Sequence, residues 1–426
     1  MIQVVLPNNC KAERQYAVSI LLEEWLGLPV EIHFEETFFS AEIKLENGNR
    51  LLLEDHFFHH FSDGEGNYLR RENLPKAPVF LIKMNNPFLP ENDLPLVFGS
   101  QKMEISNREI TCGADLFASA FFMLTRWEEY VCPDRDIHQR FPAKASIAYR
   151  YGFLHRPVVN EYGEMLWNML IYLGIRQQRK QLQFESIITH DVDYPLLWNT
   201  PWSPVKKFSG SLLKRRNLKE GLYYWKNYFQ TLRGKANDPF DTFDYLMSQA
   251  EANKCKAHFF FLCGGKHRFD NPFSFPLPFV RDLIKEVSAR GHYIGVHPSY
   301  DSYNQPELFR TELQRMENLC GHRITTGRQH FLRFEAPRTW EIWEENQMDW
   351  SSTVYYAESA GFRCGTCIPF SVFNFLTRQP YKLKELPLTL MEGTYINYQK
   401  LSPDKMWEAM ENTVKTVKKY RGCFVL

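Results

Sequence analysis

The sequence has no excess of charge of either sign. Its 426 residues include 51 lysines and arginines and 50 aspartates and glutamates, so the formal net charge at pH 7 is +1. A protein that binds nucleic acid through its bulk charge needs a basic excess or a concentrated basic face. The overall balance therefore argues against nucleic acid as a partner.

A long apolar run and a dense set of cysteines are also lacking. No stretch approaches the roughly 20 uninterrupted apolar residues that a bilayer crossing needs, so we expect no membrane span. The nine cysteines are an odd number spread over the whole chain, unlike the dense, even set of a small secreted scaffold. The first ten residues have no basic region and too short an apolar run for a signal peptide. We expect a cytoplasmic protein, unless a leader was removed.

Apolar and aromatic residues are plentiful. Hydrophobic residues make up 44% of the chain and aromatic residues 15%, which is ample to bury a core, because disordered chains have the opposite composition. We find no internal repeat and no low-complexity tract. At roughly 100–200 residues per domain, the length predicts two or three domains.

The first part of the chain has the pattern of a small α+β domain. Apolar spacing predicts helices over 12–26, 115–130 and about 160–175, and strands over 30–34, 41–45, 50–53 and 79–82. Charges of both signs are dense from Arg126 to Arg140, and we interpret them as a network that ties a loop to its domain rather than as a second functional surface. The polar stretch 177–181 predicts the boundary, which gives an N-terminal domain of residues 1–180.

The pattern changes after residue 180. Short apolar runs are separated by helical or long connecting segments, and they lie at 184–189, 257–262, 293–296, 324–330, 352–355 and 423–426. This alternation predicts a parallel sheet that is either closed into a barrel or doubly wound. In such folds the chemistry lies at the C-terminal ends of the strands, so the residues after these runs are the candidates for a site.

Two carboxylates follow the first of these runs. Asp191 and Asp193 stand at i and i+2, which places them on one side if the strand continues. One could ligate a metal while the other, kept off the metal, accepts a proton from water. The segment alone leaves a second interpretation open, a pair of turn-forming aspartates.

Ligand-type residues also follow two later runs. His297 directly follows the run 293–296, where a neutral imidazole suits a metal ion, although a lone histidine is more often structural. Arg328 and His330 share a face at i and i+2 and offer a cation to orient a carboxylate and a second imidazole. We interpret Arg333 as a surface arginine.

Cys364 and Cys367 form a single CxxC pair. One such pair without a second is weak evidence for zinc, so we expect structural cysteines. The neighbouring Arg363, and Trp340, are candidates for lining a substrate cleft, because aromatic faces suit sugar rings. Because the chain contains many aromatic residues, most of them must nevertheless lie in the core.

These segments resemble the polysaccharide deacetylase (NodB-homology) superfamily. Thr189-His190-Asp191-Val192-Asp193 resembles its first motif, in which a threonine-x-aspartate run supplies a catalytic base and a metal-ligating aspartate. His297 falls where the second motif places a metal-binding histidine. Arg328 or Arg333 falls where the third motif places the arginine beside the base.

The chain is similar, more closely, to a bacterial subgroup of these deacetylases that has a distinct N-terminal domain of unknown role. The similar segments run across nearly the whole chain and are 121–130, 138–142, 294–300, 328–330 and 361–367. The resemblance implies a distorted (β/α)7 TIM-like barrel over residues 181–426, preceded by the smaller α+β domain. It also implies a divalent metal, commonly zinc, held by one aspartate and two histidines.

The resemblance implies a role for each matching residue. Asp191 would be the base, Asp193 and His297 metal ligands, and Arg328 the partner that orients Asp191. The superfamily's second motif usually has another histidine one helical turn after the first, but this chain has Asp301 there. The third ligand is then Asp301, His330 or a residue not recognised in the sequence, and we favour His330 because imidazole suits zinc.

The superfamily's last motif is a strand leading to a leucine-x-histidine whose histidine is the general acid. This sequence ends at Leu426 within an apolar run, so we expect a chain truncated before that acid.

The implied activity is removal of acetyl groups from N-acetylated sugars in a bacterial cell-wall, capsule or lipid-linked glycan. The alternatives are a carbohydrate-binding or scaffolding protein without turnover, and a phosphoester hydrolase, which the lack of a Gly-rich phosphate loop disfavours.

Overall fold

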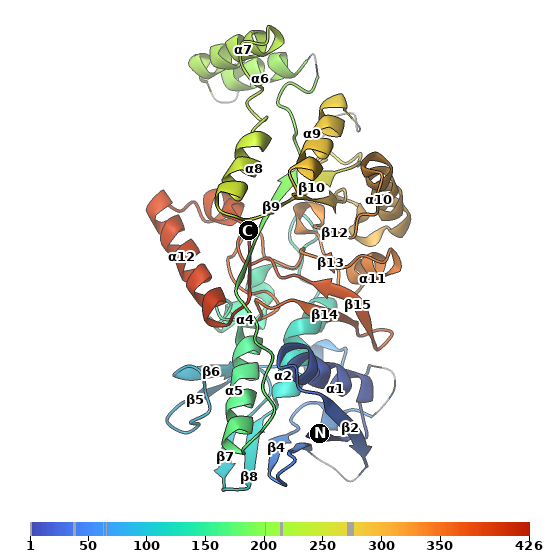
Figure 1. The fold of residues 1–426 in the computed structure, drawn as a ribbon, viewed down its shortest axis with the longest axis vertical. Helices are drawn as coiled ribbons and strands as arrows, with labels where there is room; N and C mark the ends of the chain where they lie inside the picture. The colour runs from blue at the N-terminus through green and yellow to red at the C-terminus, as the bar shows by residue number, and fades with distance from the viewer. Residues whose placement is uncertain are drawn as a thin grey trace. The chain divides into compact units, whose positions relative to one another are not determined.

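The computed structural model describes residues 2–36, 40–62, 64, 66–200, 202–213, 216–270 and 277–426. The protein is of the mixed α/β class (Figure 1). It divides into two compact units. Unit 1 comprises Met1–Ser186 with Phe331–Leu426, and unit 2 comprises Ile187–His330. The division into domains 1–180 and 181–426 stays a prediction.

The N-terminal part of unit 1 contains a six-stranded mixed sheet. Its strands follow the spatial order β2-β1-β3-β4-β8-β7, and β1 pairs in parallel with β2 and antiparallel with β3. The strands are β1 (Ile2–Pro7), β2 (Val30–Glu35), β3 (Ser40–Lys44), β4 (Arg50–Glu54), β7 (Gly99–Ile105) and β8 (Glu109–Ala114). A separate antiparallel pair is formed by β5 (Val79–Ile82) and β6 (Asp93–Leu96). The predicted strands at 30–34, 41–45, 50–53 and 79–82 are confirmed.

The helices of this part are mostly those that the apolar spacing predicts. They are α1 (Lys11–Val18), which continues as a π-helix (Ser19–Trp25), α2 (Leu116–Thr125), α3 (Trp127–Val131), α4 (Ile147–Arg150) and α5 (Val158–Tyr172). The single helix predicted over 115–130 is wrong, because the chain breaks at Arg126, whose φ of 57° is left-handed. The buried Arg126 side chain donates to Glu129 at 2.8 Å and to Glu128 at 3.4 Å, so the predicted charge network around it is confirmed.

The C-terminal part of unit 1 adds short strands, two α-helices and a π-helix (Thr394–Tyr398). The strands and α-helices are α11 (Arg338–Glu345), β13 (Trp350–Ser351), β14 (Phe370–Asn374), β15 (Gln379–Glu385), α12 (Pro403–Lys419) and β16 (Cys423–Val425). The strand predicted over 352–355 is wrong. The buried Glu385 carboxylate accepts hydrogen bonds from the backbone amides of Thr353 and Val354 at 2.9 and 2.8 Å, which takes these amides out of the sheet ladder.

Unit 2 is built on neighbouring parallel strands in the spatial order β12-β11-β10-β9. The strands are β9 (Glu185–Val192), β10 (Ala257–Leu262), β11 (Tyr293–His297) and β12 (Thr326–Gly327). Helices α6 (Ser203–Leu213), α7 (Leu218–Leu232) and α8 (Phe243–Ala252) lie between β9 and β10 in the chain. Helix α9 (Pro278–Ala289) precedes β11, and α10 (Pro306–Cys320) precedes β12. This βα alternation confirms the parallel arrangement, while the closed (β/α)7 barrel stays a prediction.

Two glycines let β10, β11 and β12 approach closely. A Cβ on Gly295 of β11 would lie 2.4 Å from a ring carbon of Phe260 and 2.7 Å from the Thr326 carbonyl oxygen. A Cβ on Gly327 would lie 2.0 Å from the Val296 carbonyl oxygen. The strand predicted over 324–330 is shorter than expected, because β12 covers only Thr326–Gly327. His297 ends β11, and Arg328 and His330 follow β12.

None of the helices in the described ranges has both the length and the apolar character that a membrane crossing requires. The cytoplasmic location stays a prediction.

Candidate metal centre

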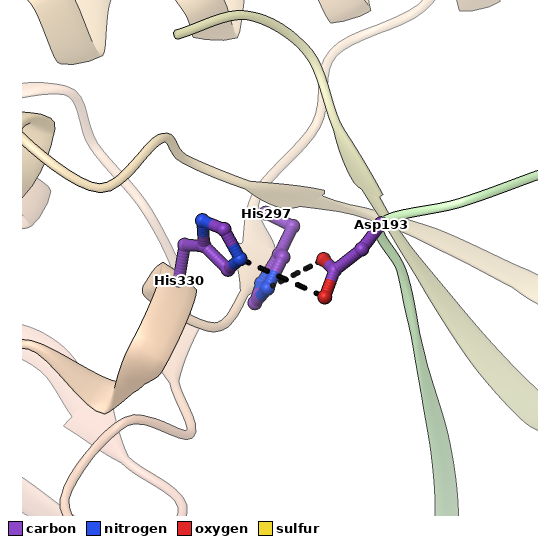
Figure 2. Close-up of side chains that lie close together, drawn as sticks. All are labelled: Asp193, His297 and His330. Carbon is purple, nitrogen blue, oxygen red and sulfur yellow. Dashed lines mark ion pairs between the residues drawn. The ribbon is translucent and has the colours of Figure 1, made fainter. Parts of the chain in front are cut away.

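Three side chains of unit 2 converge at the C-terminal ends of its parallel strands (Figure 2). Asp193 follows β9, His297 is the last residue of β11, and His330 lies three residues beyond β12. The Nε2 atom of His297 lies 3.3 Å from Asp193 Oδ1, and that of His330 lies 3.6 Å from Asp193 Oδ2. Parallel strands end at one edge of a sheet, so residues far apart in sequence meet here.

Hydrogen bonds orient both imidazole rings. His297 Nδ1 lies 2.6 Å from the Arg328 carbonyl oxygen, which can only accept, so this nitrogen carries the proton. His330 Nδ1 lies 3.1 Å from Asp270 Oδ1 and donates in the same way. With Nδ1 engaged in these contacts, each ring directs its Nε2 atom toward Asp193, as metal-ligating histidines do.

Asp270 is a residue that the sequence did not reveal. It is buried in the loop after β10, and its carboxylate accepts hydrogen bonds from the backbone amides of Tyr300 at 2.9 Å and His267 at 3.0 Å. Burial raises the pKa of this carboxyl, but His330 and these amides outweigh burial and lower it overall. Asp270 is thus an ionised, fixed partner for His330, and no motif or strand end in the sequence marks it.

The electrostatics of the three candidate ligands favour a bound cation. Burial raises the pKa of Asp193, but hydrogen bonds with His297 and His330 outweigh it and hold the pKa well below its usual range. Burial lowers the pKa of His330, but Asp193 and Asp270 reverse this and raise it to about 9. The two carboxylates beside His330 thus favour a positive charge at this position.

Asp191 lies beside this group but is held apart from it. Its Oδ1 accepts a hydrogen bond from Nη1 of the buried Arg328 at 3.0 Å, and its Oδ2 lies 4.0 Å from His297 Nε2. The same Nη1 atom donates to Thr189 Oγ1 at 2.8 Å. Thr189 and Asp191 project on one side of β9, as the i, i+2 spacing predicts. The Asp191 side chain is 32% exposed, so this carboxylate is accessible to water.

The residues present fit a divalent metal. Four-coordinate zinc with bonds of about 2.0–2.1 Å has ligand atoms separated by about 3.4 Å, close to the 3.3 and 3.6 Å separations observed. Two imidazoles and one carboxylate are the ligand types of catalytic zinc sites and of iron(II) sites with open positions. Asp301, the other candidate third ligand, is outside the group, whose ligand atoms lie within 4.8 Å of one another.

Two predicted substrate-binding residues are buried in unit 1. Arg363 is 2% exposed and donates from Nε to Glu129 at 2.9 Å and from Nη1 to the Tyr355 carbonyl oxygen at 2.9 Å. Trp340 is 1% exposed, and its indole N–H donates to Glu385 at 3.0 Å. These contacts are structural, and the substrate contacts of both residues stay predictions without a supporting observation.

The remaining candidates are structural. Arg333, predicted to be a surface arginine, is 5% exposed and donates to the His138 carbonyl oxygen at 3.0 Å, so that prediction is wrong. Cys364 and Cys367 are buried free thiols whose pKa values burial raises. In the part of the chain that the structure describes, neither belongs to a group that could hold a metal, which agrees with the structural interpretation.

Comparison with known proteins adds two findings. A family described as a "family of unknown function (DUF7033)" matches residues 2–174, a range that ends six residues before the predicted domain boundary. No curated protein sequence matches the chain.

Several solved structures are similar to part of this chain. A putative polysaccharide deacetylase from Mycobacterium smegmatis is 14% identical with a TM-score of 0.35, over 58% of this chain and 77% of that one. An allantoinase is 13% identical with a TM-score of 0.34, over 57% and 76% of the two chains. A probable polysaccharide deacetylase from Pseudomonas aeruginosa PAO1 is 9% identical with a TM-score of 0.34, over 60% and 82%. No substrate for this chain follows from these likenesses.

Proposed function

We propose that the chain is a metal-dependent carbohydrate deacetylase that hydrolyses the acetamide group of an N-acetylated bacterial glycan. The observation that carries the proposal is the pairing of two neighbouring groups. Asp193, His297 and His330 form a compact set of ligand atoms, and Asp191 stands beside them, held by Arg328 and kept off the set. The resemblance of these segments to the deacetylase superfamily supports the same assignment.

Asp193, His297 and His330 would hold the metal, for which zinc is the expected ion. When bound, a divalent ion supplies Lewis-acid polarisation of the acetamide carbonyl and increases the acidity of water. The orientation of both imidazoles by the Arg328 carbonyl and by Asp270 keeps their Nε2 atoms directed at this position.

Asp191 is the general base of the proposed reaction. Arg328 fixes its Oδ1 atom, so Oδ2 is the oxygen directed toward the ligand group and suited to take a proton from the attacking water. Thr189 shares the same guanidinium nitrogen and fixes its position.

Elemental analysis of the purified protein tests the metal site. We expect about one divalent ion per chain in the wild type and a loss of that ion in Asp193→Ala and in His297→Ala. Asp191→Asn is the matched control, because it changes a carboxylate in the same site that is not a ligand, and we expect it to retain the metal. A wild-type chain that binds no ion after zinc is added contradicts the proposal.

Acetate release from N-acetylglucosamine oligomers tests the chemistry. We expect turnover by the zinc-loaded wild type and a decrease of about 10²–10⁴-fold in Asp191→Asn, as for loss of a general base. Retention of metal by this variant separates loss of the base from loss of the site. A wild type that binds both the metal and the oligomers but releases no acetate is instead the carbohydrate-binding protein of the alternative interpretation.

A further inference from the structure

Helices α6 and α7 form a hairpin in the connection between β9 and β10 of unit 2. The two helices pack side by side (Figure 1). The Phe208 ring of α6 lies edge-on to the Trp225 ring of α7, with centroids 5.9 Å apart, and also contacts Gly221. The hairpin begins ten residues after Asp193, so it belongs to the loops at the strand ends that carry the candidate metal centre.

An apolar stripe on α7 faces solvent. Its five members recur at i, i+4, i+7, i+11 and i+14, the spacing that places residues on one face of a helix. A helix of a globular protein normally turns such a stripe toward the core. Here every member is exposed, and they are Leu218 (53%), Leu222 (53%), Trp225 (39%), Phe229 (41%) and Leu232 (64%).

A basic row runs along one side of this stripe. Lys219, Lys226 and Arg233 recur every seven residues, next to the apolar stripe, and all three are exposed. Residues 203–235 contain nine lysines and arginines and one glutamate, in a chain whose total net charge is only +1. The net charge of the whole chain is therefore close to zero although this one segment is strongly basic.

Helix α6 and the residue before it add to the exposed apolar surface of the hairpin. Their exposed apolar side chains are Trp202 (70%), Val205 (44%), Leu212 (42%) and Leu213 (77%). An exposed Trp, Leu and Phe surface bordered by Lys and Arg is typical of helices that lie in the interface of a membrane.

We propose that the α6–α7 hairpin docks on the surface of an anionic lipid bilayer. The apolar stripe of α7 would enter the boundary between headgroups and acyl chains, and the basic row would contact the anionic headgroups. Nucleic acid would match the charge but leave the exposed leucines without an apolar partner. A second copy of the chain would bring two strongly basic hairpins together, which like-charge repulsion opposes. Docking goes beyond the proposed function, because it does not depend on turnover.

Vesicle co-sedimentation of the full chain tests the proposal. The probes are vesicles of phosphatidylcholine alone and vesicles in which about one third of the lipid is phosphatidylglycerol. We expect binding to the anionic vesicles, little binding to the neutral ones, and release as the salt concentration rises and shortens the Debye length. Lipids whose acyl chains are brominated near the carbonyl end should quench the tryptophan fluorescence of the bound protein. The variant Trp225→Leu should lose part of that quenching.

Two variants separate the apolar and basic contributions. Leu222→Glu with Phe229→Glu disrupts the stripe and should abolish binding. Lys219→Gln with Lys226→Gln should weaken the partition coefficient by about fivefold per residue. Trp407→Glu on α12 and Lys285→Gln on α9 are the matched controls, because they change an exposed tryptophan (69%) and an exposed lysine (80%) outside the hairpin.

The result that overturns the proposal is one of three. The wild type fails to bind anionic vesicles, it binds neutral and anionic vesicles equally, or the hairpin variants bind like the wild type while circular dichroism shows that they are folded. Sedimentation velocity tests the alternative that a second copy of the chain binds the stripe. A dimer that Leu222→Glu with Phe229→Glu dissociates, in a chain that does not bind vesicles, assigns the stripe to a second copy and rejects the membrane.

Discussion

Replacing Asp270 by asparagine should weaken metal binding without removing a ligand. In the wild type, Asp270 Oδ1 accepts from His330 Nδ1 at 3.1 Å and from the Tyr300 amide at 2.9 Å, while Oδ2 accepts from the His267 amide at 3.0 Å. Asparagine has one carbonyl oxygen and one NH2 group, so it can satisfy only one side of this arrangement. The other side then places a donor against a donor, and the negative charge behind His330 is lost.

The expected loss follows from what Asp270 does for His330. Partners in the outer shell of a metal site orient the ligating ring and increase its basicity, and their mutation costs about 10–100-fold in metal affinity. This range corresponds to about 1.4–2.7 kcal/mol. The lower end applies if asparagine keeps its oxygen toward His330, and the upper end applies if the His330 ring turns away.

Zinc titration against a competing chelator measures this loss. Asp301→Asn is the matched control, because Asp301 is the acid that rivals His330 as third ligand and lies outside the group of candidate ligand atoms. We expect Asp301→Asn to keep wild-type affinity and His330→Ala to lose more affinity than Asp270→Asn. Wild-type affinity in Asp270→Asn, or a large loss in Asp301→Asn, would refute this account of the site.

Three further predictions concern stability. Glu129→Gln should lower the free energy of unfolding by about 3 kcal/mol, because it leaves the buried Arg126 and Arg363 guanidinium groups without their shared carboxylate. His258→Phe should make the free energy of unfolding less sensitive to acid. Burial, and to a smaller extent the charge of Arg328, lowers the pKa of His258 from 6.5 to about 4. Between these values the unfolded chain binds more protons, so wild-type stability falls with falling pH by at most about 3 kcal/mol from this residue. Gly295→Ala should cost about 1–3 kcal/mol and also weaken zinc binding, since its Cβ would meet the Thr326 carbonyl oxygen at 2.7 Å.

Each of these stability measurements has a control. Urea unfolding of Glu307→Gln, whose exposed pair with Arg310 has an N–O distance of 2.9 Å, should stay within about 0.5 kcal/mol of the wild type. For His258→Phe, parallel stability curves of variant and wild type from pH 7 to 4 would contradict the pKa argument. Gly210→Ala, in a helix with no atom within 4 Å of the added Cβ, should be neutral or stabilising by up to about 1 kcal/mol.

The sequence predicts a helix or strand correctly where the residues of that segment alone determine its structure. The run 257–262, Ala-His-Phe-Phe-Phe-Leu, is a strand because it is apolar, rich in aromatic residues and short. The guanidinium of Arg126, at the break between α2 and α3, donates to the hydroxyl of Tyr356, which lies 230 residues further along the chain. The end of β13 depends on Glu385, which lies 32 residues beyond Thr353. Such contacts between distant residues leave no periodic signal near the element that they change.

The candidate site likewise contains residues that the sequence predicts and one that it does not. Asp191, Asp193 and His297 follow strands that the sequence predicts, and the common edge of a parallel sheet is enough to expect them together. Asp270 has no such marker, because its role depends on a loop that brings its carboxylate behind His330. Arg363 and Trp340 show the reverse error: an arginine and a tryptophan suit a sugar site by type, but burial decides their use, and both are buried.

The position of His330 explains how a site can tolerate the departure at Asp301. In the superfamily that these segments resemble, the second histidine usually follows the first by one helical turn, whereas His330 comes from the segment after the next strand. In this chain the segment after β12 brings the His330 imidazole close to His297 and Asp193, because β11 and β12 are neighbouring parallel strands whose ends share one edge. This arrangement requires that β12 lie close against β11, which Gly295 and Gly327 permit. It also requires that the His330 ring be oriented, which the hydrogen bond to Asp270 does. The topology of the strand ends, rather than the spacing of ligands in the sequence, therefore determines which residues can complete such a site.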